Sequence, residues 1–325
     1  MRRRNRRIPA VLAIVMAVLM MFASCGSSGS DAGAMRDKTA KALYSQVQEA
    51  QTGAVGGDWT VIALSKSGVE TEKDYYDRYY DSVCDYVSSM KGDLSSTKYT
   101  EYARLSIALS CIGRDPEDTA GYDLMKPAKD LDFVKKQGIN GPVFALIAAN
   151  MNGYEPVLDK ADKYIDYILS QEISGGGFSL EGPKGNPYID ITAMTVQALS
   201  YYKDDAKVKK VIDRAVDVMA DLQQEDGRYD SSESISQTII ALTAAGVDPM
   251  TDERFITDDK TLLDALAGYM TDGDMFAHEE GSDSDMFAHE EGSDSDMMAT
   301  EQALCALDSL VLAEEGQMLY EAAGN

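Results

Sequence analysis

Asp190 is the residue whose type and neighbours best suit a part in a chemical reaction. It is a carboxylic acid between two isoleucines, in Tyr188-Ile189-Asp190-Ile191-Thr192-Ala193. Apolar neighbours desolvate a carboxylate, raise its pKa and so make it a weaker acid. An aspartate at the start of a helix can also accept hydrogen bonds from the first backbone N–H groups. We expect Asp190 to cap a helix, and contact with a ligand or acid catalysis are the alternatives.

The two histidines, His278 and His289, occupy the same position in two copies of one segment. Each begins the sequence His-Glu-Glu-Gly-Ser-Asp, but the separation of the two histidines does not match the spacing of helical zinc sites. We expect a surface loop here. The chain also contains no Gly-x-Ser-x-Gly, Walker or dinucleotide-binding motif and no EF-hand order. The sequence therefore predicts neither a metal site nor a cofactor.

The N-terminal residues predict export and a lipid anchor. Five arginines precede an apolar run from Ile8 to Phe22, which is short for a membrane span and typical of a signal peptide. The run ends in Phe22-Ala23-Ser24-Cys25, which resembles the lipobox of bacterial lipoproteins. We therefore expect a signal peptide at 1–24, lipidation of Cys25, a flexible tether at 25–35, and a location on the extracellular face of the cell membrane. An ordinary signal peptide cleaved near Ala23 is the alternative.

Charge excludes one class of partner. The chain has 30 basic and 55 acidic residues, a net charge of −25, and loss of the five arginines of residues 1–24 would make it −30. We do not expect such an acidic chain to bind nucleic acid, or to bind anionic lipid through a basic patch. Contact with the membrane is therefore expected only through the lipid on Cys25. The remaining cysteines, Cys84, Cys111 and Cys305, form no Cys-x-x-C pair and are expected to be buried thiols.

A short apolar pattern recurs six times along residues 36–325, which we expect to form a single domain. Its first alanines are Ala63, Ala108, Ala148, Ala198, Ala241 and Ala306, and the intervals between them are similar except for the longer last one. An exact tandem duplication at 274–295, in which 285–295 repeats 274–284, accounts for that interval and is expected to form a loop. One-faced amphipathic stretches lie between the repeats, at 71–90, 154–171, 206–222 and 258–270. We expect alternating inner and outer helices.

The repeats resemble those of the squalene cyclase and protein prenyltransferase superfamily. The likeness rests on Gly176-Gly177-Phe178 followed by residues 188–199, with further copies at 236–242 and 296–304 and an opening repeat at 58–64. It implies an all-α fold, an α/α toroid of about six inner and six outer helices, as in bacterial prenyltransferase-like surface lipoproteins. A weaker likeness to the cobalamin-carrier toroids would require a partner protein, because no β domain follows the repeats.

The catalytic motifs of that superfamily are incomplete in this chain. The zinc-binding segments of the prenyltransferases align with Asp190-Ile191-Thr192 and with residues 296–300, where the cysteine and the histidine are absent. One aspartate cannot hold zinc. In the acid motif of the cyclases, Asp190 takes the middle position, but Tyr188 and Ile191 replace the flanking acids. The resemblance therefore implies the fold more strongly than the chemistry.

The sequence as a whole predicts a surface protein that binds without catalysis. The expected ligand is a hydrophobic or macrocyclic small molecule, or a partner protein. An exported enzyme of the terpene cyclase type, with Asp190 as its acid, and a structural or adhesion scaffold are the alternatives. The residues expected to face the ligand cavity are Trp59, Tyr188, Asp190, Thr195, Gln197, Gln237 and Gln302.

Overall fold

The computed structural model describes residues 31–279 and 294–321. The expected signal peptide, Cys25, His289 and most of the duplicated segment lie outside these residues. Helix α1 (Ala32–Gln46) begins within the expected tether, where the Asp31 carboxylate accepts a hydrogen bond from the backbone N–H of Ala34 at 3.1 Å. This side-chain cap stabilises the helix start, since it satisfies one of the free N–H groups there, and residues 32–35 are therefore helical where a flexible segment was expected.

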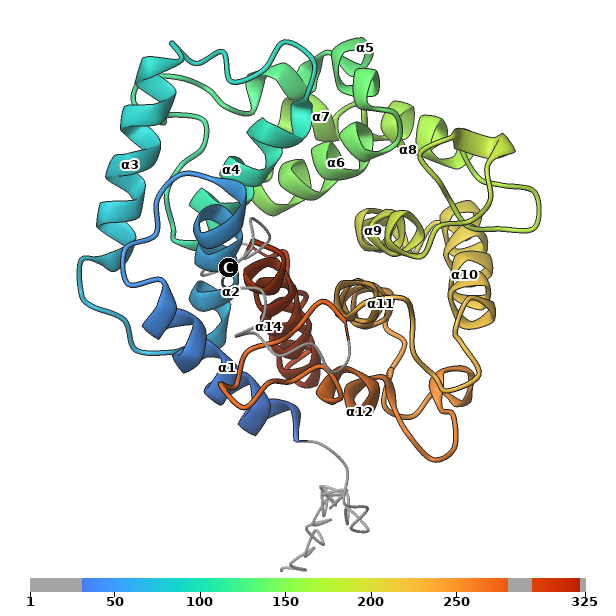
Figure 1. Cartoon of the computed structure of the whole chain (residues 1–325). Helices are drawn as coiled ribbons and strands as arrows, with labels where there is room; N and C mark the ends of the chain where they lie inside the picture. The colour runs from blue at the N-terminus through green and yellow to red at the C-terminus, as the bar shows by residue number, and fades with distance from the viewer. Residues whose placement is uncertain (1–30, 280–293, 322–325) are drawn as a thin grey trace, which may run out of the picture.

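The described residues are all-helical and contain no strand beyond three isolated β-bridges. Each of the six apolar repeats forms a helix. These are α2 (Trp59–Ser67), α4 (Tyr99–Cys111), α6 (Asn140–Asn152), α9 (Ile189–Leu199), α11 (Ser232–Ala245) and α14 (Asp294–Glu314). Each contacts the next along the chain, and α14 also contacts α2. Figure 1 shows these six helices nearest the middle of the molecule.

The remaining helices lie outside this set (Figure 1). They are α1, α3 (Tyr75–Ser89), α5 (Leu131–Val134), α7 (Glu155–Leu158), α8 (Ala161–Ser170), α10 (Ala206–Asp221) and α12 (Leu262–Ala267). Short 3-10 turns at 126–129, 135–137, 182–184, 200–202 and 253–255, and a π-helical turn at 54–58, join them. The expected stretch at 154–171 is divided into α7 and α8, and the other three expected stretches each contain one helix. Where the structure describes the chain, no helix has the length and apolar character needed to cross a membrane.

Burial separates the two sets of helices as their sequences predict. The inner helices are buried on most sides, and α6 and α9 contain no exposed residue. Helix α10 instead buries one stripe, which includes Val208, Val211, Ala215 and Met219. An outer helix with one apolar face stabilises the fold by packing that face inward, because each buried aliphatic side chain contributes about 1.5–3 kcal/mol.

The glycine of the repeat ends the inner helices. Gly68, Gly153 and Gly246 follow α2, α6 and α11 in the left-handed conformation, and Gly113 stands at φ 70° just after α4. Glycine adopts this conformation without the steric cost that a Cβ brings, so it is well suited to closing a helix. The Ala-Leu pattern followed by glycine therefore marks the C-terminal end of an inner helix.

The same hydrogen-bonded contact between a threonine and a phenylalanine, here called the clasp, occurs in two repeats. Comparison of the two shows which connection the duplication lengthens. The Thr192 hydroxyl accepts from the Phe178 N–H at 3.0 Å, and the Thr300 hydroxyl accepts from the Phe276 N–H at 2.9 Å. The partners are 14 residues apart in the first clasp and 24 in the second. Without one copy of the duplicated segment, the two separations would be nearly equal. The duplication therefore lengthens a connection between two fixed points.

Part of the duplicated segment can be compared with its predicted loop. Residues 274–279 form no helix, as expected, whereas Asp294 and Ser295 belong to the first turn of α14. The loop prediction is wrong for these last two residues of the second copy. They directly precede the helical residues of the last repeat, so the helix begins inside the copy.

Candidate functional site

Asp190 lies in the first turn of α9 but does not cap it. The capping position is Tyr188, whose backbone is extended, and no side chain accepts a capping hydrogen bond there. The prediction of a cap is wrong, because Asp190 already has helical geometry and cannot reach back to the free N–H groups. Burial raises the pKa of Asp190, while contacts with Ser234 of α11 and with Tyr188 oppose this rise. The carboxylate thus joins the starts of two inner helices.

A histidine–carboxylate pair lies beside Asp190. The Nδ1 atom of His278 lies 3.0 and 2.9 Å from the two carboxylate oxygens of Glu233, and the negative charge of Glu233 also raises the pKa of Asp190. The Ser232 hydroxyl donates to the Ala277 carbonyl at 2.7 Å and holds the same segment against α11. His278 is half exposed in irregular structure, which agrees with the predicted surface loop. In residues 31–279 and 294–321, no group of three or more histidines, cysteines or carboxylates is placed to hold a metal ion.

Three of the predicted cavity residues form one hydrogen-bonded row. The Gln197 amide donates to the Gln237 side chain at 2.8 Å, and the Gln237 amide donates to the Gln302 side chain at 3.0 Å. The row joins α9, α11 and α14. Gln237 and Gln302 hold equivalent repeat positions, four residues before Ala241 and Ala306, whereas Gln197 directly precedes Ala198. Thr195 is fully buried and donates to the Ile191 carbonyl of its own helix at 2.7 Å, and Trp59 packs half-buried against the core. The structure therefore brings the glutamines together but uses the Thr195 hydroxyl within α9.

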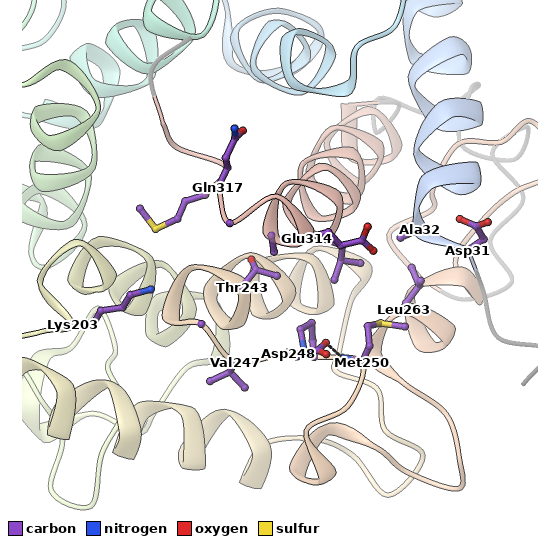
Figure 2. Close-up of a pocket in the computed structure, with 16 residues that line it drawn as sticks. Asp31, Ala32, Lys203, Thr243, Val247, Asp248, Met250, Leu263, Glu314 and Gln317 are labelled. Atoms are coloured by element: carbon purple, nitrogen blue, oxygen red, sulfur yellow. Dashed lines mark hydrogen bonds between the residues drawn. The ribbon is translucent and has the colours of Figure 1, made fainter. Parts of the chain in front are cut away.

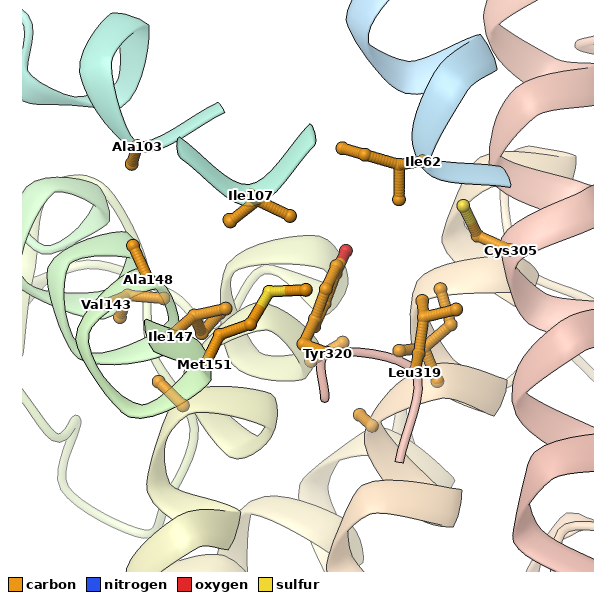
Figure 3. Packing of buried hydrophobic residues seen from close by; sticks show 14 of the residues in the cluster. Ile62, Ala103, Ile107, Val143, Ile147, Ala148, Met151, Cys305, Leu319 and Tyr320 are labelled. Atoms are coloured by element: carbon orange, nitrogen blue, oxygen red, sulfur yellow. The ribbon is translucent and has the colours of Figure 1, made fainter. Parts of the chain in front are cut away.

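The space between the inner helices contains the C-terminal segment of the described chain. Figure 3 shows Tyr320 and Leu319 among apolar side chains of α2, α4, α6 and α14. Both are buried, at 6% and 2% exposure. The Tyr201 hydroxyl donates to the Tyr320 carbonyl, and the Lys66 ammonium donates to the Glu321 carbonyl at 2.6 Å. Side chains of the protein itself therefore fill this part of the interior.

Sequence reasoning missed a buried acid in α14. Glu301 is fully buried, and its Oε1 atom accepts from the Gly56 N–H at 2.9 Å and from the Thr60 hydroxyl. Its Oε2 atom has no hydrogen-bond partner among the described residues. Burial raises the pKa of Glu301 to about 7. Glutamate in an apolar helix was the available signal, but only the fold shows that it faces the start of α2.

A second buried carboxylate in this region is ion-paired. Asp58 is fully buried, and the Arg104 guanidinium donates to it at 2.7 Å. The Tyr79 hydroxyl donates to its other oxygen at 2.7 Å, and Arg104 also bonds to Glu101 at 2.7 Å. A buried charge is tolerated when its partners satisfy it in this way. These contacts tie α2, α3 and α4 together and point to a structural role.

The candidate binding site is a cavity of about 650 Å³ at the opposite, C-terminal ends of α11 and α14. Its walls come from the start of α1, the turn that contains Lys203, the end of α11 and the segment after it, α12, and the end of α14 and the segment after it. The lining residues are Asp31, Ala32, Lys203, Thr243, Gly246, Val247, Asp248, Pro249, Met250, Leu263, Leu310, Ala313, Glu314, Gly316, Gln317 and Met318. Figure 2 shows Lys203 on the left of the view, Asp31 on the right and Glu314 between them.

The polar groups of the cavity differ in how they are used. The Lys203 ammonium donates to the Ala244 carbonyl at 3.1 Å. The Asp248 carboxylate accepts from the Met250 N–H at 2.9 Å and from the Thr251 hydroxyl at 2.7 Å, and Asp31 caps α1. Leu263 and Leu310 supply buried apolar surface to the walls. The cavity therefore offers a ligand apolar and polar surface in similar amounts, with a few charged groups at fixed positions.

None of the seven residues predicted to face a ligand lines this cavity. They belong to the helix starts and middles, whereas the cavity lies where two inner helices end. No local pattern marks its lining, because the residues come from segments between positions 31 and 318 that only folding brings together.

Comparisons with known proteins add no assignment to this geometry. No protein-family model matches the chain, and no curated protein matches it.

Proposed function

We propose that this chain is a lipid-anchored surface protein that binds a small molecule without chemical conversion. In this proposal Cys25 carries the lipid, and the six inner helices form the inner layer of an α/α toroid. Two observations support the toroid. Each inner helix contacts the next, with the last against the first, and the amphipathic helices lie outside them.

The observation that carries the binding function is the cavity at the ends of α11 and α14. Its volume of about 650 Å³ falls within the roughly 300–1,000 Å³ of typical small-molecule sites. Its lining combines aliphatic and methionine side chains with a small number of charged groups. This combination suits an organic ligand that presents both an apolar body and a polar end.

Acid catalysis of the cyclase type receives less support. Protonation of an alkene requires a strong acid, whereas burial raises the pKa of Asp190 and so weakens it as an acid. Leu319 and Tyr320 occupy the interior between several inner helices, in the region where a cyclase of this fold would require an open aromatic cavity.

The filled interior favours a scaffold as the second candidate function. A toroid that packs its own C-terminal segment inside could act by presenting its acidic surface to another protein. The two functions differ in one measurable property, because only the binding protein must retain or exchange a small molecule.

Native mass spectrometry of the full chain purified from its own host tests the proposal. We expect a bound species of small mass that is absent after denaturation. The variant Ala313→Trp is the control, since Ala313 is exposed on a cavity wall and a large side chain there should displace the ligand. An unloaded chain that also binds nothing from a host small-molecule extract would contradict the binding function and favour the scaffold.

The anchor is tested separately. Metabolic labelling with a fatty acid should label the wild-type chain and leave the Cys25→Ser variant unlabelled. Equal labelling of both chains would show that Cys25 is not the lipidated residue.

A further inference from the structure

Two inner helices point their C-terminal ends at the cavity. The C-terminal end of a helix carries partial negative charge, which a nearby cation stabilises. For α11 the chain supplies that cation, because Lys203 donates to the carbonyl of Ala244 near the helix end. The last turn of α14 contains no basic residue, and the helix ends at Glu314; among the described residues that line the cavity, Lys203 at the end of α11 is the one cation. A carboxylate at this position adds negative charge where a helix is already negative.

The other charged residues that line the cavity do not neutralise the negative charge at the end of α14. Among the residues that line it, the carboxylates are Asp31, Asp248 and Glu314, and Lys203 is the one cation. Asp31 and Asp248 already accept hydrogen bonds from backbone N–H groups, whereas Glu314 lies at the end of α14. A cavity with a net charge of −2, inside a chain of net charge −25, attracts cations and repels anions.

The apolar walls limit which cations fit. Leu263 and Leu310 line the cavity with little exposure to bulk solvent, and Met250 and Met318 are partly exposed. A small inorganic cation gains nothing from such walls. An organic cation with an aliphatic body can bury that body against them, and the flexible methionines can adapt to its shape.

We propose that the cavity binds an amphipathic organic cation, with its ammonium or related group at Glu314 and its apolar body between Leu263, Leu310 and the methionines. The inference rests on the proposed binding function and adds the place and the ligand class. In this proposal Lys203 binds the C-terminal end of α11. Its positive charge keeps the cationic group of the ligand away from that side of the cavity.

Three probes of equal length separate charge from apolar burial. They are n-hexylammonium, n-hexanol and n-hexanoate, titrated against the full chain in zwitterionic lipid nanodiscs by saturation-transfer NMR, with empty nanodiscs as the reference. We expect hexylammonium to bind about tenfold more tightly than hexanol, as for one charge-assisted contact, and hexanoate to bind least. Equal binding of the three probes, or preference for hexanoate, would overturn the proposal.

Matched variants locate the cationic end. Glu314→Gln should weaken hexylammonium about tenfold and leave hexanol unchanged. Glu315→Gln removes the adjacent charge, which does not line the cavity, and should change hexylammonium by less than about twofold. Lys203→Gln should strengthen hexylammonium, the opposite direction from loss of folding. If Glu314→Gln has no larger effect than Glu315→Gln, the assigned contact is wrong.

The outcomes also distinguish this inference from the proposed function. If the native chain retains a neutral or anionic ligand that Glu314→Gln does not release, the binding function stands and the cation site fails. If the chain retains nothing from its host but binds hexylammonium through Glu314, the cation site stands and the physiological binding function loses its support.

Discussion

Replacing Glu301 with glutamine should make the protein less sensitive to rising pH. The Glu301 side chain is fully buried between α14 and α2, and its Oε1 atom accepts hydrogen bonds from Gly56 and Thr60. A glutamine oxygen can accept both bonds with similar geometry. Only the ability to ionise is lost.

The size of the effect follows from the raised pKa of this group. Burial raises the pKa of Glu301 from 4.5 to about 7, with the hydrogen bonds from Thr60 and Gly56 and the charge of Asp58 as smaller influences. The folded state therefore holds the proton more tightly than the unfolded chain. Its stabilisation is complete below pH 4.5 and is lost as the pH rises towards 7, by about 3 kcal/mol in total. Above pH 7 the wild type carries a buried charge that Glu301→Gln avoids.

Urea unfolding of the full chain between pH 4.5 and 8.5 measures this difference. We expect the free energies of unfolding of Glu301→Gln and wild type to agree within about 1 kcal/mol at the acidic end, and the variant to be more stable by about 2–3 kcal/mol at the basic end. Other buried acids, such as Asp308, affect both proteins alike and cancel in the comparison. Glu315→Gln, at an exposed site, should follow the wild type. A constant difference across the pH range would refute the argument that Glu301 ionises in the fold.

Three other substitutions or deletions test the remaining assignments. Asp190→Asn should change the free energy of unfolding by less than about 1 kcal/mol at neutral pH, because Asp190 is no helix cap; a loss of about 2 kcal/mol in thermal or urea unfolding would contradict this. Arg104→Met should cost about 3–5 kcal/mol by leaving Asp58 buried without its cation, and adding Asp58→Asn should recover much of that loss in a double-mutant cycle. Deleting residues 274–284 should leave the melting temperature within about 3 °C of wild type, because the second copy repeats Phe276 and its neighbours exactly and restores the clasp spacing; calorimetry would show a large fall if both copies pack.

The sequence predicted those parts of the protein that depend on neighbouring residues. Helical periodicity and the Ala-Leu pattern identified all six inner helices, and a glycine marked the end of four of them, because the burial of a helix face and the end of a helix are set within a few turns. The repeat also placed Gln237 and Gln302 at equivalent positions, but Gln197 occupies another position of its repeat, and only the packing of α9 against α11 adds it to the hydrogen-bonded row. The duplicated segment was visible as an insertion for the same reason.

Tertiary structure decided where polar groups from distant segments meet. Asp190 has the sequence of a helix cap, yet the extended backbone at Tyr188 places the cap elsewhere and turns the carboxylate towards Ser234. Glu301 becomes a buried acid only because α14 packs against the first turn of α2, which lies near the other end of the chain. The cavity likewise forms where α11 and α14 end beside α1. Desolvation and the fields of helix ends act through space rather than along the sequence, so these properties appear only once the helices are packed.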